Sequence, residues 1–263
     1  MIPTAVGRLS VRVEGDGPTA VLWHSLYVDD RSWDRVSAGL SAHRRLVRIT
    51  GPGHGASERP AAPFTLADCA AAAAEVLAAV GEHGAVDWLG NAWGGHVGVV
   101  FAAEHPGRVR TLASFNAPMQ ALGEQELKRV RLLIRAYRLI GARGPVLTGV
   151  TDALLSHRTR ESDPDAVAYV HECLRSADRG SLLTVIRSVS VGRPDLRPLL
   201  PAITAPTLHV TTEVDELWTP VQAQDSAALS PHGEALIAGG GHLTPLESPD
   251  ETIDTVRRLW GRA

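Results

Sequence analysis

A glycine-flanked turn at residues 90–94 places an alanine where covalent chemistry would need a nucleophile. The segment 86–95 is Val-Asp-Trp-Leu-Gly-Asn-Ala-Trp-Gly-Gly, which is typical of a short strand, a tight turn and the start of a helix. A Gly-x-Ser-x-Gly turn of this kind holds a serine whose hydroxyl attacks a carbonyl carbon. The flanking glycines are present here, but the central residue is Ala92. The sequence therefore predicts a site built for acyl transfer without its attacking atom.

Two further positions have residue types that activate such a nucleophile. His242 follows Gly239–Gly241 in a loop that has little local rigidity of its own, and it is our candidate general base. A carboxylate must fix the tautomer of that base, and Glu213, Asp215 and Glu216 lie in one preceding segment. The chain order of turn, carboxylate and histidine is one in which such triads occur. These residues predict proton transfer at the same site as the turn.

The elements that must position these residues alternate between strands and helices. We expect strands at residues 9–13, 20–23, 46–49, 109–114, 206–211 and 234–238, besides the one that precedes the turn at 90–94. Gly15-Asp16-Gly17 is predicted to close a hairpin after the first of them. Thr65 is predicted to cap a helix over 66–80 with Asp68 in its first turn, and Pro249 to lie in the first turn of the last helix. This alternation indicates an α/β fold whose mostly parallel sheet is flanked by helices.

The segment 118–201 differs from the rest, because it is helical in pattern, rich in Arg and Leu, and carries no strand signal. It begins after one predicted strand and ends before another, at the carboxyl ends where open α/β sheets bind ligands. We therefore predict a core of residues 1–117 and 202–263 with a helical cap of residues 118–201. Most arginines of the cap are expected on solvated helix faces, but one or two that turn inward would suit an acidic or polar-headed substrate; examples are Arg129, Arg131, Arg135, Arg138 and Arg143.

The chain resembles the α/β-hydrolase-fold superfamily, of the serine hydrolase type with a cap. The resemblance extends over nearly its whole length outside residues 118–201. The matching motifs are His24-Ser25-Leu26-Tyr27, Gly53-His54-Gly55-Ala56-Ser57, Asp215 followed by Pro220, and Gly241-His242 followed by Glu247 and Pro249. The resemblance implies a triad of the nucleophile position, Asp215 and His242. Some members carry the acid one strand earlier, where this chain has Asn116, which is not a carboxylate.

The same resemblance implies the remaining site residues. The backbone amides of Leu26 and Trp93 are the expected oxyanion hole, since amides serve there whatever their side chains. His24, Ser25, Tyr27 and Asn91 are expected to contact the substrate. Ser25 replaces the usual glycine of its turn, either as a tolerated small residue or as an added hydroxyl at the ligand. Substrates of this type are small carbonyl compounds: esters, lactones, or compounds with a carbon–carbon bond next to a carbonyl.

Composition narrows the partners. The chain has 263 residues and a net charge of −3, which disfavours nucleic acids and anionic membranes as partners. Cys69 and Cys173 are expected to be free thiols of a cytoplasmic protein, because no secretory leader or membrane-spanning run is apparent. No group of His, Cys and Asp residues has the spacing of metal ligands, so no metal is predicted. The glycine-rich turn 51–55 lacks the lysine of a phosphate-binding loop, so no nucleotide cofactor is predicted either. A small-molecule substrate is the expected partner; the sequence leaves monomer and homodimer open.

Ala92 admits three interpretations. In the first, it replaces the serine of a hydrolase and leaves an inactive variant with an intact base, acid and oxyanion turn. In the second, alanine is native and the protein binds a ligand or uses His242 and Asp215 without a covalent intermediate; Ser25 and Thr50, which also depart from the family pattern, favour this. In the third, the lost residue is the aspartate of an epoxide hydrolase or dehalogenase, although Tyr27 stands where those enzymes usually carry proline.

Overall fold

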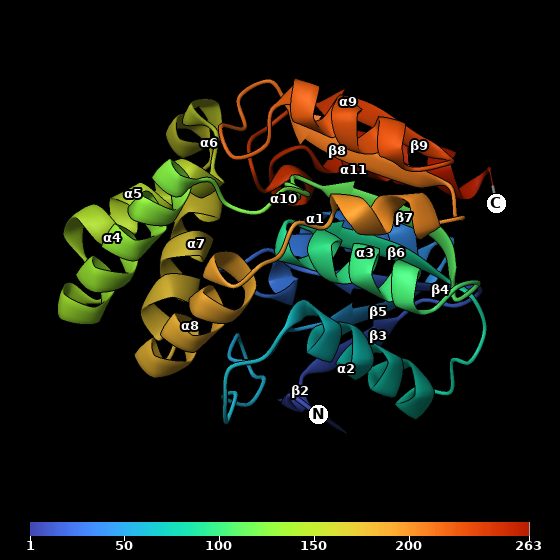
Figure 1. Cartoon of the computed structure of the whole chain (residues 1–263), viewed down its shortest axis with the longest axis horizontal. Coiled ribbons are helices and arrows are strands. Elements are labelled where there is room, and N and C mark those ends of the chain that lie inside the picture. Colours follow the sequence, from blue (N-terminus) through green and yellow to red (C-terminus); the bar gives the residue numbers. More distant parts are fainter. Residues whose placement is uncertain (263) are drawn as a thin grey trace.

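A seven-stranded sheet forms the centre of the computed structural model, which describes residues 1–262 (Figure 1). Its strand order is β3-β5-β4-β6-β7-β8-β9, and every neighbouring pair is parallel except β3 and β5. The strands are β3 (Val11–Glu14), β4 (Thr19–Trp23), β5 (Arg45–Ile49), β6 (Val86–Asn91), β7 (Val109–Phe115), β8 (Thr207–Thr212) and β9 (Gly233–Ala238). The predicted α/β fold with a mostly parallel sheet is confirmed.

The predicted hairpin around Gly15-Asp16-Gly17 is wrong. This turn does join β3 to β4, but β5 lies between them in the sheet, and β3 pairs antiparallel with β5. The reason is burial: every residue of β4 is buried, so β4 takes a central place between two parallel strands. The half-exposed β3 suits the edge. Another antiparallel pair, β1 (Ile2–Thr4) with β2 (Gly7–Leu9), forms a separate two-stranded sheet.

Helices cover both faces of the sheet (Figure 1). One face carries α2 (Leu66–Ala79), α3 (Trp93–Glu104), α9 (Pro220–Leu229) and the short 3₁₀ helix η3 (Arg197–Ala202). The other carries η1 (Asp30–Trp33), α1 (Asp34–Ser41), α10 (Thr244–Glu247) and α11 (Pro249–Trp260). Side chains of β4 alternate between two apolar cores, since Val21 and Trp23 pack on the first face and Ala20 and Leu22 on the second.

Two local predictions concern helix starts. Thr65 caps α2: its side chain accepts from the backbone N–H of Asp68, whose carboxylate accepts in return from the Thr65 backbone, a complete capping box. Pro249 is the first residue of α11. Both predictions are confirmed. They could be made from the sequence because each depends on a few adjacent residues. Cys69 and Cys173 are buried free thiols.

Between β7 and β8 the described chain forms helices and loops. These helices are α4 (Glu124–Ile140), α5 (Gly144–Leu154), α6 (His157–Ser162), α7 (Pro164–Ser176), α8 (Arg179–Ile186) and the π-helical turn η2 (Arg187–Val191), before η3. They share an apolar core of their own, which also takes in Val28, Leu243 and Leu246 from the rest of the molecule. Within residues 1–262, no helix is long and apolar enough to cross a membrane.

Candidate active site

The turn between β6 and α3 is held in an uncommon backbone conformation. Ala92 lies between the last residue of the strand and the first of the helix, with φ 47° and ψ −104°. A non-glycine residue in such a region costs on the order of 1–3 kcal/mol and persists only where its surroundings impose it. The Ala92 N–H donates to the Phe115 carbonyl at 2.7 Å, which ties the turn to β7. The methyl group of Ala92 thus stands at a strained point in the wall of a cavity.

The glycines around Ala92 are required by close packing. A Cβ atom on Gly90 would lie 2.2 Å from the carbonyl of Gly94, and one on Gly94 would lie 2.0 Å from the carbonyl oxygen of Trp23. A Cβ atom on Gly95 would lie 2.5 Å from the hydroxyl of Ser114. Such contacts are too short for any side chain, so the strand and helix approach one another only without them. This explains the spacing of glycines that the sequence shows.

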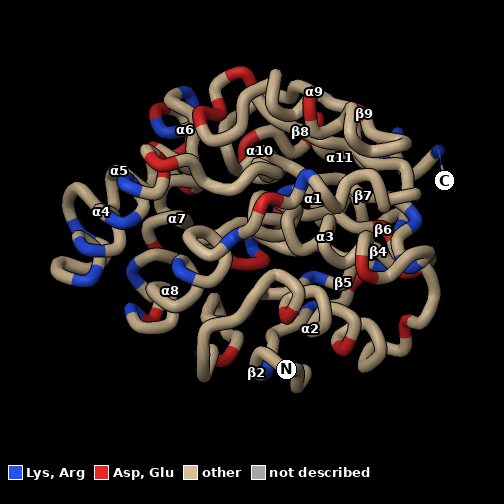
Figure 2. The backbone as a smooth tube through the Cα atoms, in the orientation of Figure 1, with Lys and Arg blue, Asp and Glu red and all other residues tan. Residues whose placement is uncertain are grey.

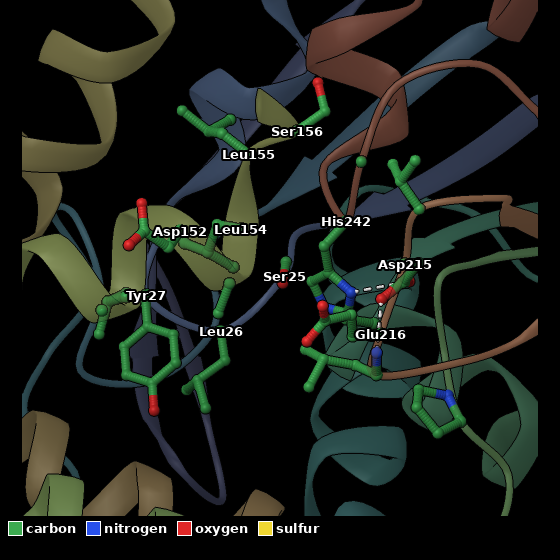
Figure 3. A pocket seen from close by; sticks show the side chains of 18 of the residues that line it. Ser25, Leu26, Tyr27, Asp152, Leu154, Leu155, Ser156, Asp215, Glu216 and His242 are labelled. Carbon is green, nitrogen blue, oxygen red and sulfur yellow. Dashed lines mark hydrogen bonds and ion pairs between the residues drawn. The ribbon is translucent and has the colours of Figure 1, made fainter. Parts of the chain in front are cut away.

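His242 and Asp215 meet beside this turn (Figure 3). The Nδ1 atom of His242 lies 3.1 Å from Oδ2 of Asp215, and the side chains are 7% and 1% exposed. An ionised carboxylate only accepts, so Nδ1 carries the proton and Nε2 is left as the basic nitrogen. No hydrogen bond to Nε2 is found within residues 1–262. The pair therefore has the arrangement of a general base with its orienting acid.

Three donors hold Asp215. Besides His242, the Asn116 amide donates to Oδ2 at 2.9 Å and the Leu217 backbone N–H donates to Oδ1 at 2.9 Å. Burial by itself raises the pKa of Asp215, but the nearby His242 imidazole and the hydrogen bonds outweigh burial, so this pKa lies below its ordinary value. Asp215 is therefore ionised at neutral pH. Glu213 and Glu216 form no such contact with His242.

Amides from two strand ends hold the loop of His242. The Asn116 amide also donates to the carbonyl of Gly241, and its oxygen accepts from the Thr244 hydroxyl at 2.7 Å. The Asn91 amide donates to the carbonyl of His242 at 3.0 Å. These contacts join residues more than one hundred positions apart, and they fix the imidazole although its own glycine-rich segment does not.

The expected oxyanion donors both line the cavity. The backbone N–H groups of Leu26 and Trp93 have no hydrogen-bond partner within residues 1–262. Ser25 and Tyr27, which were expected to contact substrate, line the same cavity. The Ser25 hydroxyl is buried without a partner among the described residues, and Tyr27 has a positive φ of 73°. The structure thus brings these four residues together with Ala92 and His242.

His24 and Asn91 are not brought to the cavity, so the expectation that they contact substrate is corrected. His24 is fully buried: its Nδ1 donates to the Ser25 carbonyl at 2.7 Å and its Nε2 accepts from the Gly51 N–H at 2.9 Å. The Asn91 amide is directed to the loop of His242 instead. A side chain that hydrogen-bonds neighbouring backbone groups on the inner side of a turn is shielded from a ligand on its outer side. Both residues position the site.

The cavity has a volume of about 1450 Å³ and is shared between the core and the helices that follow β7. Figure 3 shows Leu154, Leu155 and Ser156 across from His242. Two contacts join these segments: the Ser156 N–H donates to the Glu247 carboxylate at 2.9 Å, and the Leu243 N–H donates to the Leu154 carbonyl at 3.2 Å. The residue after His242 is therefore anchored to the helical insertion.

The arginines named from the sequence do not turn inward. All five are exposed: Arg129, Arg131, Arg135 and Arg138 on α4, and Arg143 just before α5. Figure 2 shows several Lys and Arg positions along α4. Only Arg129 among them borders the cavity. Two buried residues that were not predicted from the sequence do line it, Arg193 and His96. His96 lies four residues after Ala92 on α3, a spacing that places both on one helix face and that would have revealed it. Within residues 1–262, no cluster of His, Cys, Asp and Glu could hold a metal ion.

Known proteins with similar sequences or structures include esterases and a lactonase. A pimeloyl-[acyl-carrier protein] methyl ester esterase from Xanthomonas oryzae pv. oryzae is 30% identical over 266 residues, which cover 95% of this chain and 98% of that protein. An esterase from Thermogutta terrifontis superposes with a TM-score of 0.89 at 22% identity, over 99% of this chain and 97% of that one. An enol-lactonase from Burkholderia xenovorans gives a TM-score of 0.85 at 23% identity, over 96% of both chains.

The two solved structures show that the fold is shared. The relationship in sequence is shown by the Xanthomonas methyl ester esterase and by a family model. That model, of the alpha/beta hydrolase family, matches residues 20–255, which include the turn at Ala92 and both Asp215 and His242. The chain belongs to the alpha/beta hydrolase family.

Proposed function

We propose that Ala92, His242 and Asp215 occupy the nucleophile, base and acid positions of a hydrolase site for a small carbonyl substrate. The observation that carries this proposal is the His242–Asp215 pair, 3.1 Å apart, beside a turn held at φ 47°. An ester or lactone is the favoured substrate, since the similar proteins include a methyl ester esterase and an enol-lactonase. Cleavage of a carbon–carbon bond next to a carbonyl would use the same groups.

The mechanism of such a site requires an oxygen at position 92. A serine hydroxyl there would attack the carbonyl carbon while Nε2 of His242 takes its proton, and Asp215 would stabilise the resulting imidazolium. The N–H groups of Leu26 and Trp93 would donate to the oxyanion. His242 would then protonate the leaving group, and water would release the acyl group. With Ala92 the covalent bond cannot form, so we expect the chain itself to bind substrate and to turn it over very slowly.

A second function is favoured by the free Nε2 of His242. An imidazole that is oriented by Asp215 and faces a cavity can take a proton from bound water or from an acidic C–H group without any covalent intermediate. In that case alanine is the native residue at position 92, and the protein is a ligand-binding or general-base member of its family. We also propose that residues 118–201 act as a cap, because Leu154–Arg160 and Arg193 border the cavity.

Ala92→Ser is the decisive variant. We expect serine to raise kcat for activated esters and lactones on the order of 10³–10⁶-fold, because it restores the attacking atom to an otherwise complete site. His242→Ala in the same background must abolish the gain. Ala92→Cys is a matched control for an added nucleophile, and Ala92→Asp tests the hypothesis of an epoxide hydrolase or dehalogenase.

The outcomes separate the hypotheses. Turnover that requires both the Ala92→Ser substitution and an intact His242 supports the covalent hydrolase. Turnover by the unmodified chain that is lost with His242→Ala and is not raised by Ala92→Ser supports the general-base function. Release of halide or opening of an epoxide by the Ala92→Asp variant alone supports the third. A folded Ala92→Ser variant that hydrolyses none of these substrates contradicts the covalent proposal.

A further inference from the structure

Arg193 is a buried arginine in the wall of the cavity. It follows the π-helical turn η2, a kind of turn that is frequent at functional sites, and is only 7% exposed. Its Nη1 donates to the Pro118 carbonyl at 2.6 Å and lies 2.5 Å from Nε2 of His96; its Nη2 donates to the Gln120 carbonyl at 2.9 Å. Every one of these acceptors is neutral.

The positive charge of Arg193 has no anionic partner within residues 1–262. Glu126 and Asp195 are close enough to act on it electrostatically, but neither forms an ion pair with it. Glu126 accepts from the Gly123 N–H at 2.6 Å, and Asp195 is paired with Arg197 at 2.6 Å. Burial lowers the pKa of Arg193 to about 10, so the guanidinium remains charged at neutral pH. A buried charge without a counter-charge costs free energy that an anionic ligand would recover.

His96 adds a second donor to this region. Nη1 of Arg193 donates both to the Pro118 carbonyl and to Nε2 of His96, so these two acceptors lie 3.0 Å apart. Since a guanidinium only donates, Nε2 is the acceptor in this arrangement. Nδ1 therefore carries the proton of the neutral ring, and Nδ1 has no hydrogen-bond partner within residues 1–262; the same is true of Nε of Arg193. His96 is one helical turn after Ala92, so the two are separated by about 6 Å along the axis of α3 and lie on the same side of it.

We propose that Arg193 and His96 form a recognition site for a carboxylate group of the substrate. The location of the reacting carbonyl at Ala92 rests on the proposed function. The geometry then defines a substrate class, a monoester or lactone that carries a free carboxylate a short spacer away from the reacting carbonyl. One guanidinium and one neutral N–H donor match a single carboxylate, with its one charge and two acceptor oxygens.

The test measures binding to the chain as it is, with Ala92 in place. Monomethyl esters of the straight-chain dicarboxylic acids from succinic to pimelic acid are compared by calorimetry with the corresponding dimethyl esters, which have no charge. We expect one chain length of the monoanion to bind roughly 10- to 100-fold more tightly than its diester, as a charge-assisted hydrogen bond predicts. Arg193→Met should remove this preference, whereas Arg131→Met, on the exposed side of α4, should retain it.

Arg193 also ties η2 to the loop at Pro118 and Gln120, so its methionine variant could lose the fold. Arg193→Lys is the second variant: a point charge in place of the planar fork should leave an intermediate preference. Equal affinities for monoester and diester in the unmodified chain, no binding of any monoester at millimolar concentration, or an unchanged preference in both Arg193 variants would each overturn the proposal.

These measurements need no turnover, so the two proposals can fail separately. A charge preference that depends on Arg193, together with an inactive Ala92→Ser variant, contradicts the hydrolase alone. An Ala92→Ser variant that hydrolyses both kinds of ester with equal kcat/KM contradicts the carboxylate site alone.

Discussion

Two buried imidazoles border the same cavity, but one has an anionic neighbour and the other a cationic one. Nδ1 of His242 donates to the carboxylate of Asp215, whereas Nε2 of His96 faces the guanidinium of Arg193. Burial, followed by the charge of Arg193, lowers the pKa of His96 well below its ordinary value. One residue type therefore serves two purposes: the carboxylate orients His242 so that Nε2 is left as its basic nitrogen, and the ring of His96 beside a cation stays a neutral donor.

The two regions also differ in how they are built. His242 and Asp215 both come from loops of the core, and core amides hold them. Arg193, by contrast, belongs to the insertion after β7 and meets His96 on the first helix after the turn. The proposed chemistry thus uses side chains of the core, and the proposed recognition depends on the fit between insertion and core. Substitutions on each side should separate catalysis from specificity.

Among substitutions around these two imidazoles, Asp215→Asn in the Ala92→Ser background is expected to have the largest effect. Asparagine cannot hold the tautomer of His242 or stabilise its charge, so kcat/KM should fall on the order of 10³–10⁴-fold. Steady-state kinetics with one activated ester measures the loss. Glu216→Gln is the matched control, because Glu216 also borders the cavity but makes no contact with His242. A larger loss with Glu216→Gln than with Asp215→Asn would show that Asp215 is not the acid of this site.

Asn116→Asp should have an intermediate effect on stability. It replaces a donor 2.9 Å from Oδ2 of Asp215 by a carboxylate of the same shape, so two negative charges would share one site. In the parent, the lowered pKa of Asp215 adds stability above the unfolded-state pKa, which is lost as the pH falls. In the variant, repulsion raises the carboxyl pKa above its unfolded value, so stability is lost as the pH rises instead.

Urea unfolding of both proteins at about pH 7 and about pH 3 measures this reversal. We expect Asn116→Asp to lower the free energy of unfolding by roughly 2–4 kcal/mol at neutral pH, with much of the difference removed in acid. Asn116→Gly, which suits the positive φ of 51° and adds no charge, is the control. A loss that is equal at both pH values would show that packing, and not charge, is responsible.

The smallest effect concerns the protonation of His96. Removing the charge in Arg193→Met should raise the pKa of His96 towards its ordinary value, although burial, the larger cause, should keep it lowered. A ring with a lowered pKa binds its proton more readily in the unfolded state, so His96 destabilises the fold as the pH falls; the variant should weaken that dependence. NMR titration of the His96 imidazole C–H signals, in the unmodified chain and in Arg193→Met, tests this. An unchanged His96 titration would show that Arg193 has no electrostatic influence on it.

The parts of the site that the sequence predicted are those encoded by adjacent residues. The turn around Ala92 was found because Gly90, Gly94 and Gly95 have no room for a side chain. Thr65 and Asp68 predicted their helix because a capping box spans only four positions. The family resemblance then supplied the pairing of Asp215 with His242, which spacing alone left open among three carboxylates.

Other features escaped because they depend on residues far apart in the chain. Nothing near Asn116 indicates that its amide meets Asp215, ninety-nine positions later. Arg193 and His96 are ninety-seven positions apart, and the arginines of α4 gave the stronger local signal while remaining exposed. His24 was misassigned for a related reason. Its motif predicted the turn in which it lies, but not that its side chain is buried away from the cavity.

The sequence by itself determined the order of strands and helices, the glycine turn with its alanine, and the kinds of side chain at the site, because periodicity, capping and turn chemistry act between near neighbours. Only the tertiary structure decided which strands pair, which amides hold His242, and which arginine loses its contact with water. Those outcomes depend on burial, and burial is a property of the packed molecule: a strand becomes central, or a charge becomes unpartnered, only when distant segments close around it.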